Sequence, residues 1–252
     1  MSLEQEEWWI LVFFYKSQVL VVANIAYMWD AQSAVNFESR EVTMDLKKLI
    51  DPATTVLVTM EMQQGIVGEL SGFQELRSAA TESGVLTNGP RLCEEARDSG
   101  VTVIHATAVN RSDYAGSIAN CRMLAASKKM NENGSGITEG SVGAEIISDF
   151  GPEPQDIVLP RLHGLTPFTS TSLDQVIRNL GARTIIPIGV SINIGILGLV
   201  ISAVDLGYQV VVPTDAVAGV PHEYGQTIME GSISLLATLT STEDIVAAWT
   251  TS

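Results

Sequence analysis

The sequence predicts an α/β protein with three layers, in which helices cover both faces of an open, mostly parallel sheet of about six strands. Two observations lead to this fold class. From Thr55 onward, short apolar and β-branched runs alternate with longer amphipathic stretches, which is the pattern of parallel strands joined by crossover helices. Gly100, Gly181 and Gly207 each follow a helical stretch, where a residue in the left-handed conformation commonly ends a helix.

The strands are predicted from short, nearly continuous apolar runs, which are typical of strands buried on both faces of a parallel sheet. The first run, VLVTM, follows a polar lead-in that begins at Met44. In chain order, the predicted strands cover residues 56–60, 101–107, 156–159, 184–189, 209–212 and 237–239.

The helices are predicted in the amphipathic stretches between these strands. A helix is expected to begin at His222 because Pro221 precedes it. The predicted helices cover residues 90–99, 172–180, 194–206, 222–236 and 243–249. Residues 131–143 are rich in Gly, Ser and Asn and are predicted to form a mobile loop within the domain.

The N-terminal segment is much more apolar than the rest of the chain. Residues 8–29 are long enough to raise the question of a membrane span or a signal peptide. Acidic rather than basic residues precede them, and Lys16, Ser17 and Gln18 interrupt them, which argues against both. We predict that residues 1–43 are an apolar extension outside the native domain, which covers residues 44–252. An extra strand or helix packed on that domain is the alternative.

The composition restricts the class of partner. Acidic residues outnumber basic ones 29 to 14, and a net charge of -15 would repel nucleic acid and anionic membrane surfaces. We therefore expect a small-molecule substrate, and neither nucleic acid nor a membrane as partner. The two cysteines form no CxxC pattern and the three histidines are widely spaced, so the sequence predicts a cytoplasmic protein with no metal and no cofactor.

Polar residues gather where three predicted strands end. Glu61 and Gln63 follow the first strand, and Arg161 and His163 follow the third. Residues 189–195 follow the fourth strand and lead into a helix. In an open parallel sheet, ligands collect outside the carboxyl ends of the strands, near the point where strand order reverses. We expect a carboxylate, a guanidinium and backbone N–H groups to converge on one small molecule there.

Three segments carry a resemblance to one family. They read VLVTMEMQ at 56–63, RLHGLTPFTSTSLDQVIRNLGA at 161–182, and GVSINIGILGLVISAVDLGYQVVVPTDAVAG at 189–219. This pattern resembles that of the isochorismatase-like hydrolases, also called cysteine hydrolases, from Met44 to the C-terminus. The resemblance implies a Rossmann-like fold, hydrolase activity, and a cis peptide bond between Val190 and Ser191.

The positions that carry the family's chemistry differ in this chain. The resemblance places Glu61 at the family's catalytic Asp, Arg161 at or one residue from its Lys, and Gly195 at its nucleophilic Cys. Glycine supplies no nucleophile, so the acyl-enzyme route is closed at this position. Neither Cys93 nor Cys121 replaces it, because both are expected to be structural.

Glu61 is the predicted catalytic acid or base. Family members that act on vinyl ethers without the cysteine use the acidic residue as general acid, and by that resemblance a protonated Glu61 would deliver a proton to an enol-ether carbon. A nearby Arg161 would favour the charged carboxylate instead, unless a substrate carboxylate neutralises the guanidinium. Arg161 therefore suits a substrate anchor, with a surface ion pair as its alternative. His163 is an acid/base or a donor to substrate, or else it only orders its loop.

The other predicted site residues would bind substrate. Gln63 would contact substrate or hold the turn after the first strand, and Phe168 would wall an apolar pocket or pack in the core. By the resemblance, the turn at 190–195 would present the N–H groups of residues 193–195 to an anion. The predicted substrate-binding residues are Gln63, Phe168, Val190, Ser191, Asn193 and Gly195. His105 is expected to be a core histidine, and His222 to be exposed.

Three functions stay open. The first is a cysteine-independent hydrolase that acts through Glu61 on a small carboxylated substrate, by vinyl-ether hydrolysis. The second is a catalytically silent binding or assembly protein on the same fold. The third is an amidase that uses activated water or a hydroxyl such as that of Ser191. A homo-oligomer, either a dimer or a tetramer, is expected because the apolar helix at 194–204 resembles surfaces that family members bury between subunits.

Overall fold

The computed structural model describes residues 12–15, 18–21, 45–134 and 136–250. The chain divides into two compact units, Met1–Met44 and Asp45–Ser252. In the first unit, β1 (Val12–Tyr15) pairs antiparallel with β2 (Gln18–Val21). The remainder of the predicted extension lies outside the described residues, so its exclusion from the native domain stays a prediction. In the described ranges, no helix has the length and apolar character needed to cross a bilayer.

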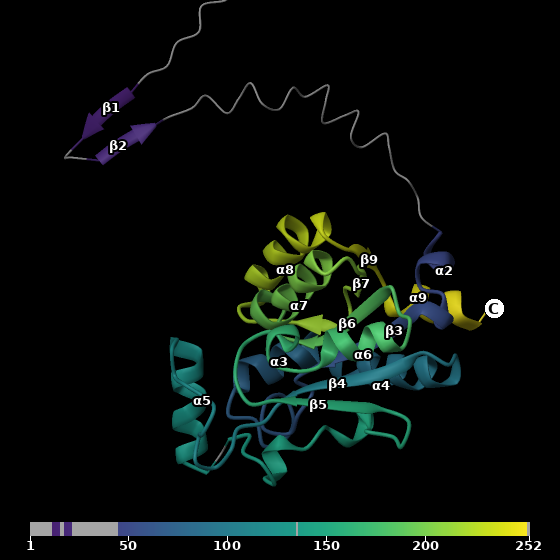
Figure 1. The fold of residues 1–252 in the computed structure, drawn as a ribbon, viewed down its shortest axis with the longest axis horizontal. Coiled ribbons are helices and arrows are strands. Elements are labelled where there is room, and N and C mark those ends of the chain that lie inside the picture. The colour runs from purple at the N-terminus through teal and green to yellow at the C-terminus, as the bar shows by residue number, and fades with distance from the viewer. Residues whose placement is uncertain (1–11, 16–17, 22–44, 135, 251–252) are drawn as a thin grey trace, which may run out of the picture. The chain divides into compact units, whose positions relative to one another are not determined.

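The second unit is built on a seven-stranded sheet with the order β5-β4-β3-β6-β7-β9, in which β8 pairs with β6 (Figure 1). All of these strand pairs are parallel. The strands are β3 (Thr55–Met60), β4 (Thr102–Ala108), β5 (Ile157–Arg161), β6 (Thr184–Val190), β7 (Gln209–Pro213), β8 (Val217–Ala218) and β9 (Thr238–Thr240). The predicted open parallel sheet is confirmed.

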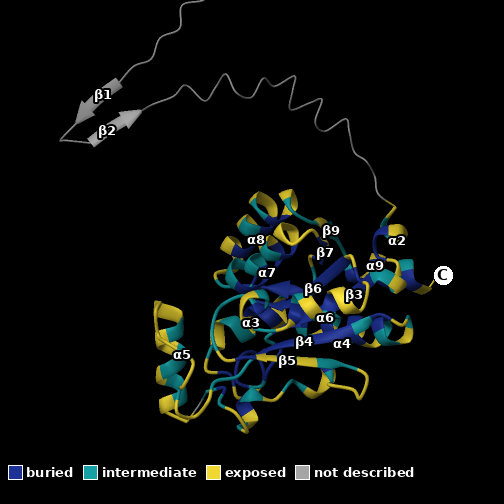
Figure 2. Ribbon diagram, viewed as in Figure 1, coloured by how far each residue is buried: buried dark blue, intermediate teal, exposed yellow. Residues whose placement is uncertain are grey.

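Helices cover both faces of this sheet and complete the three layers. They are α2 (Leu46–Leu49), α3 (Gln74–Glu82), α4 (Val85–Asp98), α5 (Arg122–Glu132), α6 (Leu173–Asn179), α7 (Leu197–Asp205), α8 (His222–Gly231) and α9 (Thr242–Thr250). Alternate residues of β3 point to opposite faces, so Leu57 packs with α3, α4 and α9 while Val56 and Val58 pack with α6, α7 and α8. Figure 2 shows the central strands buried.

The helices differ from the prediction in several places. α2, α3 and α5 were not predicted, α4 begins before Pro90 rather than at it, and α8 ends at Gly231 rather than at residue 236. Proline removes one backbone hydrogen bond from a helix interior, but the buried side chains of Val85, Leu92 and Cys93 hold α4 against the sheet. α5 has no buried residue, which is why apolar periodicity did not indicate it (Figure 2).

The topology reverses between β3 and β6. β4 and β5 extend the sheet on one side of β3, while β6, β7 and β9 extend it on the other. Parallel pairing brings the carboxyl ends of β3, β5 and β6 to the same edge. Glu61, Arg161 and Ser191 are therefore assembled at the switch point, where the strand-end rule expects a site.

Candidate active site

Glu61 and Arg161 form a buried ion pair at this edge. An Arg161 Nη2 group donates a hydrogen bond to Glu61 Oε1, and Arg161 Nε donates to the Gly164 carbonyl oxygen at 3.1 Å. The two side chains are 4% exposed for Arg161 and 19% exposed for Glu61. The surface ion pair considered for Arg161 is therefore wrong, since its guanidinium is buried.

Backbone geometry directs Glu61 out of the strand. Its φ of 56° lies in the left-handed region, which non-glycine residues seldom adopt and which tends to occur at functional sites. Its N–H still donates to the Ala106 carbonyl oxygen at 2.9 Å, so the residue is anchored to β4 as the chain leaves the sheet.

The charge state of the pair follows from its surroundings. Burial lowers the pKa of Arg161 to about 10, which leaves the guanidinium charged at neutral pH. A guanidinium bonded to a carboxylate favours the ionised form of that carboxylate. The Nη1 atom of Arg161 is buried without a hydrogen-bond partner. An unpaired buried donor is costly, so a ligand acceptor is the natural partner for it.

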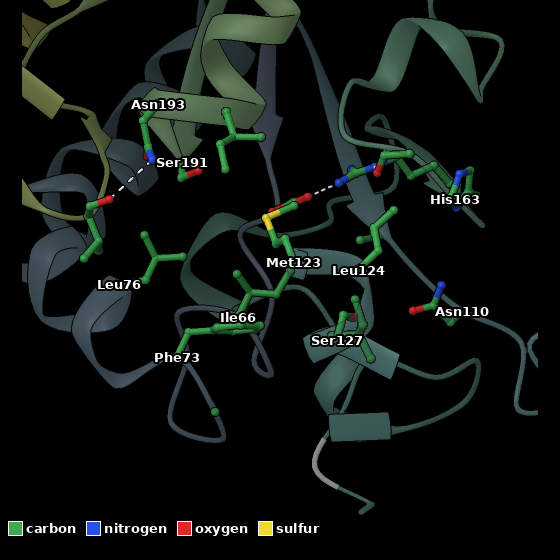
Figure 3. Close-up of a pocket in the computed structure, with 18 of the residues that line it drawn as sticks. Ile66, Phe73, Leu76, Asn110, Met123, Leu124, Ser127, His163, Ser191 and Asn193 are labelled. Atoms are coloured by element: carbon green, nitrogen blue, oxygen red, sulfur yellow. Dashed lines mark hydrogen bonds and ion pairs between the residues drawn. The ribbon is translucent and has the colours of Figure 1, made fainter. Parts of the chain in front are cut away.

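A cavity of about 540 Å³ opens beside the pair. Side chains from both sides of the switch point line it, including Glu61, Arg161, His163, Ser191 and Asn193 (Figure 3). Most of the other side chains that line it are apolar. This volume is ordinary for a small-molecule site. The predicted carboxylate and guanidinium therefore lie at one cavity, which Ser191 and Asn193 also line.

The turn after β6 departs in part from the predicted anion hole. The peptide bond between Val190 and Ser191 is cis, as the resemblance implies. The Ile194 N–H, however, donates to the Ser191 carbonyl oxygen at 3.1 Å, so it is not free for an anion. Asn193 Nδ2 donates to the Val220 carbonyl oxygen at 3.3 Å, while Asn193 Oδ1 is buried without a partner.

Gly195 is buried in the helical turn Ile192–Ile196, and neither Gly195 nor Val190 lines the cavity. A Cβ atom at position 195 would meet Met60 Cε at 3.0 Å and the Val190 carbonyl oxygen at 3.2 Å. The methionine side chain thus occupies part of the space that a nucleophilic side chain would need. No hydrogen bond links the Ser191 hydroxyl to a base among the described residues.

Two predicted substrate contacts are structural. Gln63 is fully buried, and its amide bonds the Ala108 N–H and the Ala108 and Ala144 carbonyl oxygens at 2.8 to 2.9 Å. It therefore holds the turn after β3, which was the alternative to substrate contact. Phe168 does not line the cavity; it packs in the core and stacks on Tyr208 with ring centroids 6.2 Å apart, as its own alternative described.

Sequence reasoning missed several pocket residues. Asn110 lies beyond the end of β4, so the strand-end rule could have found it had that strand been included. Phe73, Leu76 and Met123 come from or adjoin the unpredicted α3 and α5, and no local signal marks them. Ile137 lies in the predicted mobile loop, yet it is buried and lines the cavity.

The other histidines and the cysteines lie outside the cavity. His105 is fully buried and bonds Thr59 Oγ1 at 2.8 Å and Asp156 Oδ2 at 3.1 Å, as expected of a core histidine. Cys93 is buried, and burial raises the pKa of its thiol to about 12. Cys121 is exposed and precedes α5. In the described part of the chain, no three His, Cys, Asp or Glu residues gather as metal ligands do.

The family is decided by a match over most of the chain. The isochorismatase domain matches residues 55–244, which include every strand of the parallel sheet. The chain belongs to the isochorismatase family of hydrolases. The resemblance stated from the sequence is thereby confirmed.

The individual relatives share low sequence identity with this chain. The ureidoacrylate amidohydrolase RutB of Pseudomonas syringae pv. syringae (strain B728a) is 26% identical over 208 residues, which cover 78% of this chain and 82% of that protein. A cysteine hydrolase from Pseudomonas syringae pv. phaseolicola 1448A superimposes with a TM-score of 0.67 at 21% identity, over 81% of this chain and 95% of that one. The N-carbamoylsarcosine amidase from Thermoplasma acidophilum has a TM-score of 0.58 at 22% identity, over 75% of this chain and 96% of that one. These two likenesses show the fold.

Proposed function

We propose that this chain hydrolyses a small carboxylated substrate without a cysteine nucleophile, and that Glu61 moves the proton. One observation carries the proposal: Arg161 holds the Glu61 carboxylate with one terminal nitrogen, while its other terminal nitrogen is buried without a partner. The free nitrogen would donate to one oxygen of the substrate carboxylate, because a hydrogen bond between a guanidinium and a carboxylate is charge-assisted and strong.

The reaction that best suits an ionised Glu61 is hydrolysis of an amide or carbamoyl bond by water. Glu61 takes a proton from a water molecule while the water oxygen forms a bond to the carbonyl carbon. The protonated Glu61 then gives that proton to the leaving nitrogen as the C–N bond breaks. Water is consumed, an acid and an amine are formed, and no covalent enzyme intermediate is required. The relatives named as an amidohydrolase and an amidase support this class of bond.

Vinyl-ether hydrolysis is the second candidate. It is favoured by Gly195, because protonation of an enol-ether carbon requires no nucleophile. It needs a protonated Glu61 at the start, which the bonded guanidinium opposes. A substrate carboxylate on Arg161 would share the guanidinium charge and reduce that opposition.

Turnover and its pH dependence test both reactions. Wild type and the Glu61→Gln variant are assayed against N-carbamoyl amino acids, ureido acids and isochorismate. The control is Glu94→Gln, since Glu94 is an exposed carboxylate on α4 that does not line the cavity. Loss of an acid/base group is expected to lower kcat by about 10²- to 10⁴-fold in Glu61→Gln. The control should keep its rate within a few fold.

The shape of the pH profile separates the two reactions. A base mechanism loses kcat/KM as the pH falls and Glu61 becomes protonated, whereas an acid mechanism loses it as the pH rises. A Glu61→Gln variant as active as wild type would refute both. If wild type turns over no substrate while a ligand stabilises wild type and variant alike, the chain is a binding protein on this fold.

A further inference from the structure

The cavity beside Glu61 has a strongly apolar side. Ile66, Phe73, Leu76, Met123, Leu124 and Ile194 line it. Figure 3 shows Ile66, Phe73, Leu76 and Met123 gathered on one side, with Ser191 and Asn193 at one end and His163 and Asn110 at the other. The polar groups are thus separated from a continuous apolar wall, and the cavity as a whole is amphipathic.

Part of this apolar lining faces water. Met123 is 38% exposed, and Leu162, which also lines the cavity, is 44% exposed. α5, which contributes Met123 and Leu124, has no buried residue. An apolar ligand group that covers this surface would remove it from water, and that burial favours binding.

The charged side chains that line the cavity restrict how many negative charges such a ligand can carry. Among the described residues that line it, Arg161 is the one Arg or Lys, and its charge is already shared with Glu61. Glu75 adds a second carboxylate at the same cavity. A ligand with several anionic groups would therefore be repelled, while a ligand with one carboxylate and an apolar body would match the lining.

We propose that the substrate is an amphipathic monoanion whose apolar chain or ring, several carbons long, binds between α3 and α5 while its polar end meets Arg161 and Glu61. The position of the polar end rests on the proposed function, whereas the apolar body rests on the lining alone. The cavity of about 540 Å³ is continuous from the ion pair to the apolar wall, which favours one small molecule over a protein segment as the occupant.

Binding of unreactive carboxylates tests this proposal without turnover. Dissociation constants of the full chain for butanoate, hexanoate and octanoate are measured by calorimetry. Burying each added methylene is expected to tighten binding about fourfold, or about 250-fold over the four methylenes from butanoate to octanoate. An equal affinity for all three acids, or no binding of octanoate at millimolar concentration together with none of octanamide, overturns the proposal.

Variants locate the effect in the cavity. Leu124→Asn puts a polar group on the α5 wall and is expected to reduce the gain per methylene to less than twofold, with an unchanged unfolding midpoint because α5 has no buried residue. Leu235→Asn makes the same exchange at a leucine that is 81% exposed and lies outside the cavity, so it should bind like wild type. Equal behaviour of the two variants would show that octanoate binds elsewhere and refute the proposal.

Failure of this binding proposal can be distinguished from failure of the proposed hydrolysis. Glu61→Gln should keep the chain-length dependence even though it loses turnover. If butanamide, hexanamide and octanamide show the dependence and the three acids do not bind, the apolar site stands and the carboxylate anchor at Arg161 fails. If short substrates are turned over and affinity is independent of chain length, the reaction stands and this proposal fails.

Discussion

Removing either partner of the Glu61–Arg161 pair should destabilise the protein, because each single substitution leaves the other charge buried without its partner. Glu61→Gln leaves a 4% exposed guanidinium without its counter-ion, and Arg161→Met leaves the carboxylate without its donor. Breaking a buried ion pair costs about 3–5 kcal/mol when both groups are fully buried. Glu61 is 19% exposed, so water compensates part of the loss, and we expect about 2–3 kcal/mol for each single variant.

The double variant Glu61→Gln/Arg161→Met leaves no unpaired charge. Its cost should fall short of the sum of the single variants by at least about 1.5 kcal/mol, because residues in direct contact do not act additively. Urea denaturation followed by circular dichroism measures all four free energies of unfolding, and an unchanged m-value confirms that the same surface unfolds in each protein. Costs that add to within about 0.5 kcal/mol would refute the pairing on which the proposed function depends.

Four further variants test contacts elsewhere in the fold. Gly195→Ala should change stability by less than about 1 kcal/mol, because its Cβ would lie 3.0 Å from the movable end of Met60 and 3.2 Å from the Val190 carbonyl oxygen, and alanine favours the helix. Gly189→Ala should cost at least about 3 kcal/mol, since φ is 108° and its Cβ would lie 2.4 Å from a backbone oxygen, and thermal unfolding compares the two. Gln63→Ala should cost about 2–3 kcal/mol in urea because it leaves buried backbone groups of β4 unpaired; a cost under about 1 kcal/mol would contradict this. Burial holds the pKa of His105 below its ordinary value of 6.5, so stability should fall as the pH drops below 6.5, and His105→Gln should flatten the dependence of Tm between about pH 7 and pH 5.

The parallel sheet could be predicted because its central strands are buried on both faces. β3 and β6 are buried throughout, and strands of that kind read as continuous apolar runs that need no knowledge of their neighbours. α5 could not be predicted in the same way, since it buries no residue and its sequence carries no strong apolar stripe. α4 begins before Pro90 because the packing of Val85 and Leu92 outweighs the hydrogen bond that proline removes, and that packing is not visible in the local sequence.

The expected homo-oligomer stays a prediction. Ile201 and Val204 on α7 are 44% and 37% exposed in the single chain, so that helix does present apolar side chains to solvent. Light scattering of the purified protein measures the oligomeric state, and a species of 27.0 kDa alone would contradict the expectation.

The sequence by itself determined the fold, the family and the acid at the end of the first parallel strand, because these depend on patterns that are local in the chain. It also determined that no thiol stands at position 195. Only the tertiary structure decided which polar residues share a site. Gln63 lies two residues after Glu61 and Phe168 seven residues after Arg161, yet Gln63 bonds to backbone and Phe168 packs in the core. The apolar wall, too, exists only once α3 and α5 stand beside the switch point, because its residues come from segments that no periodicity connects.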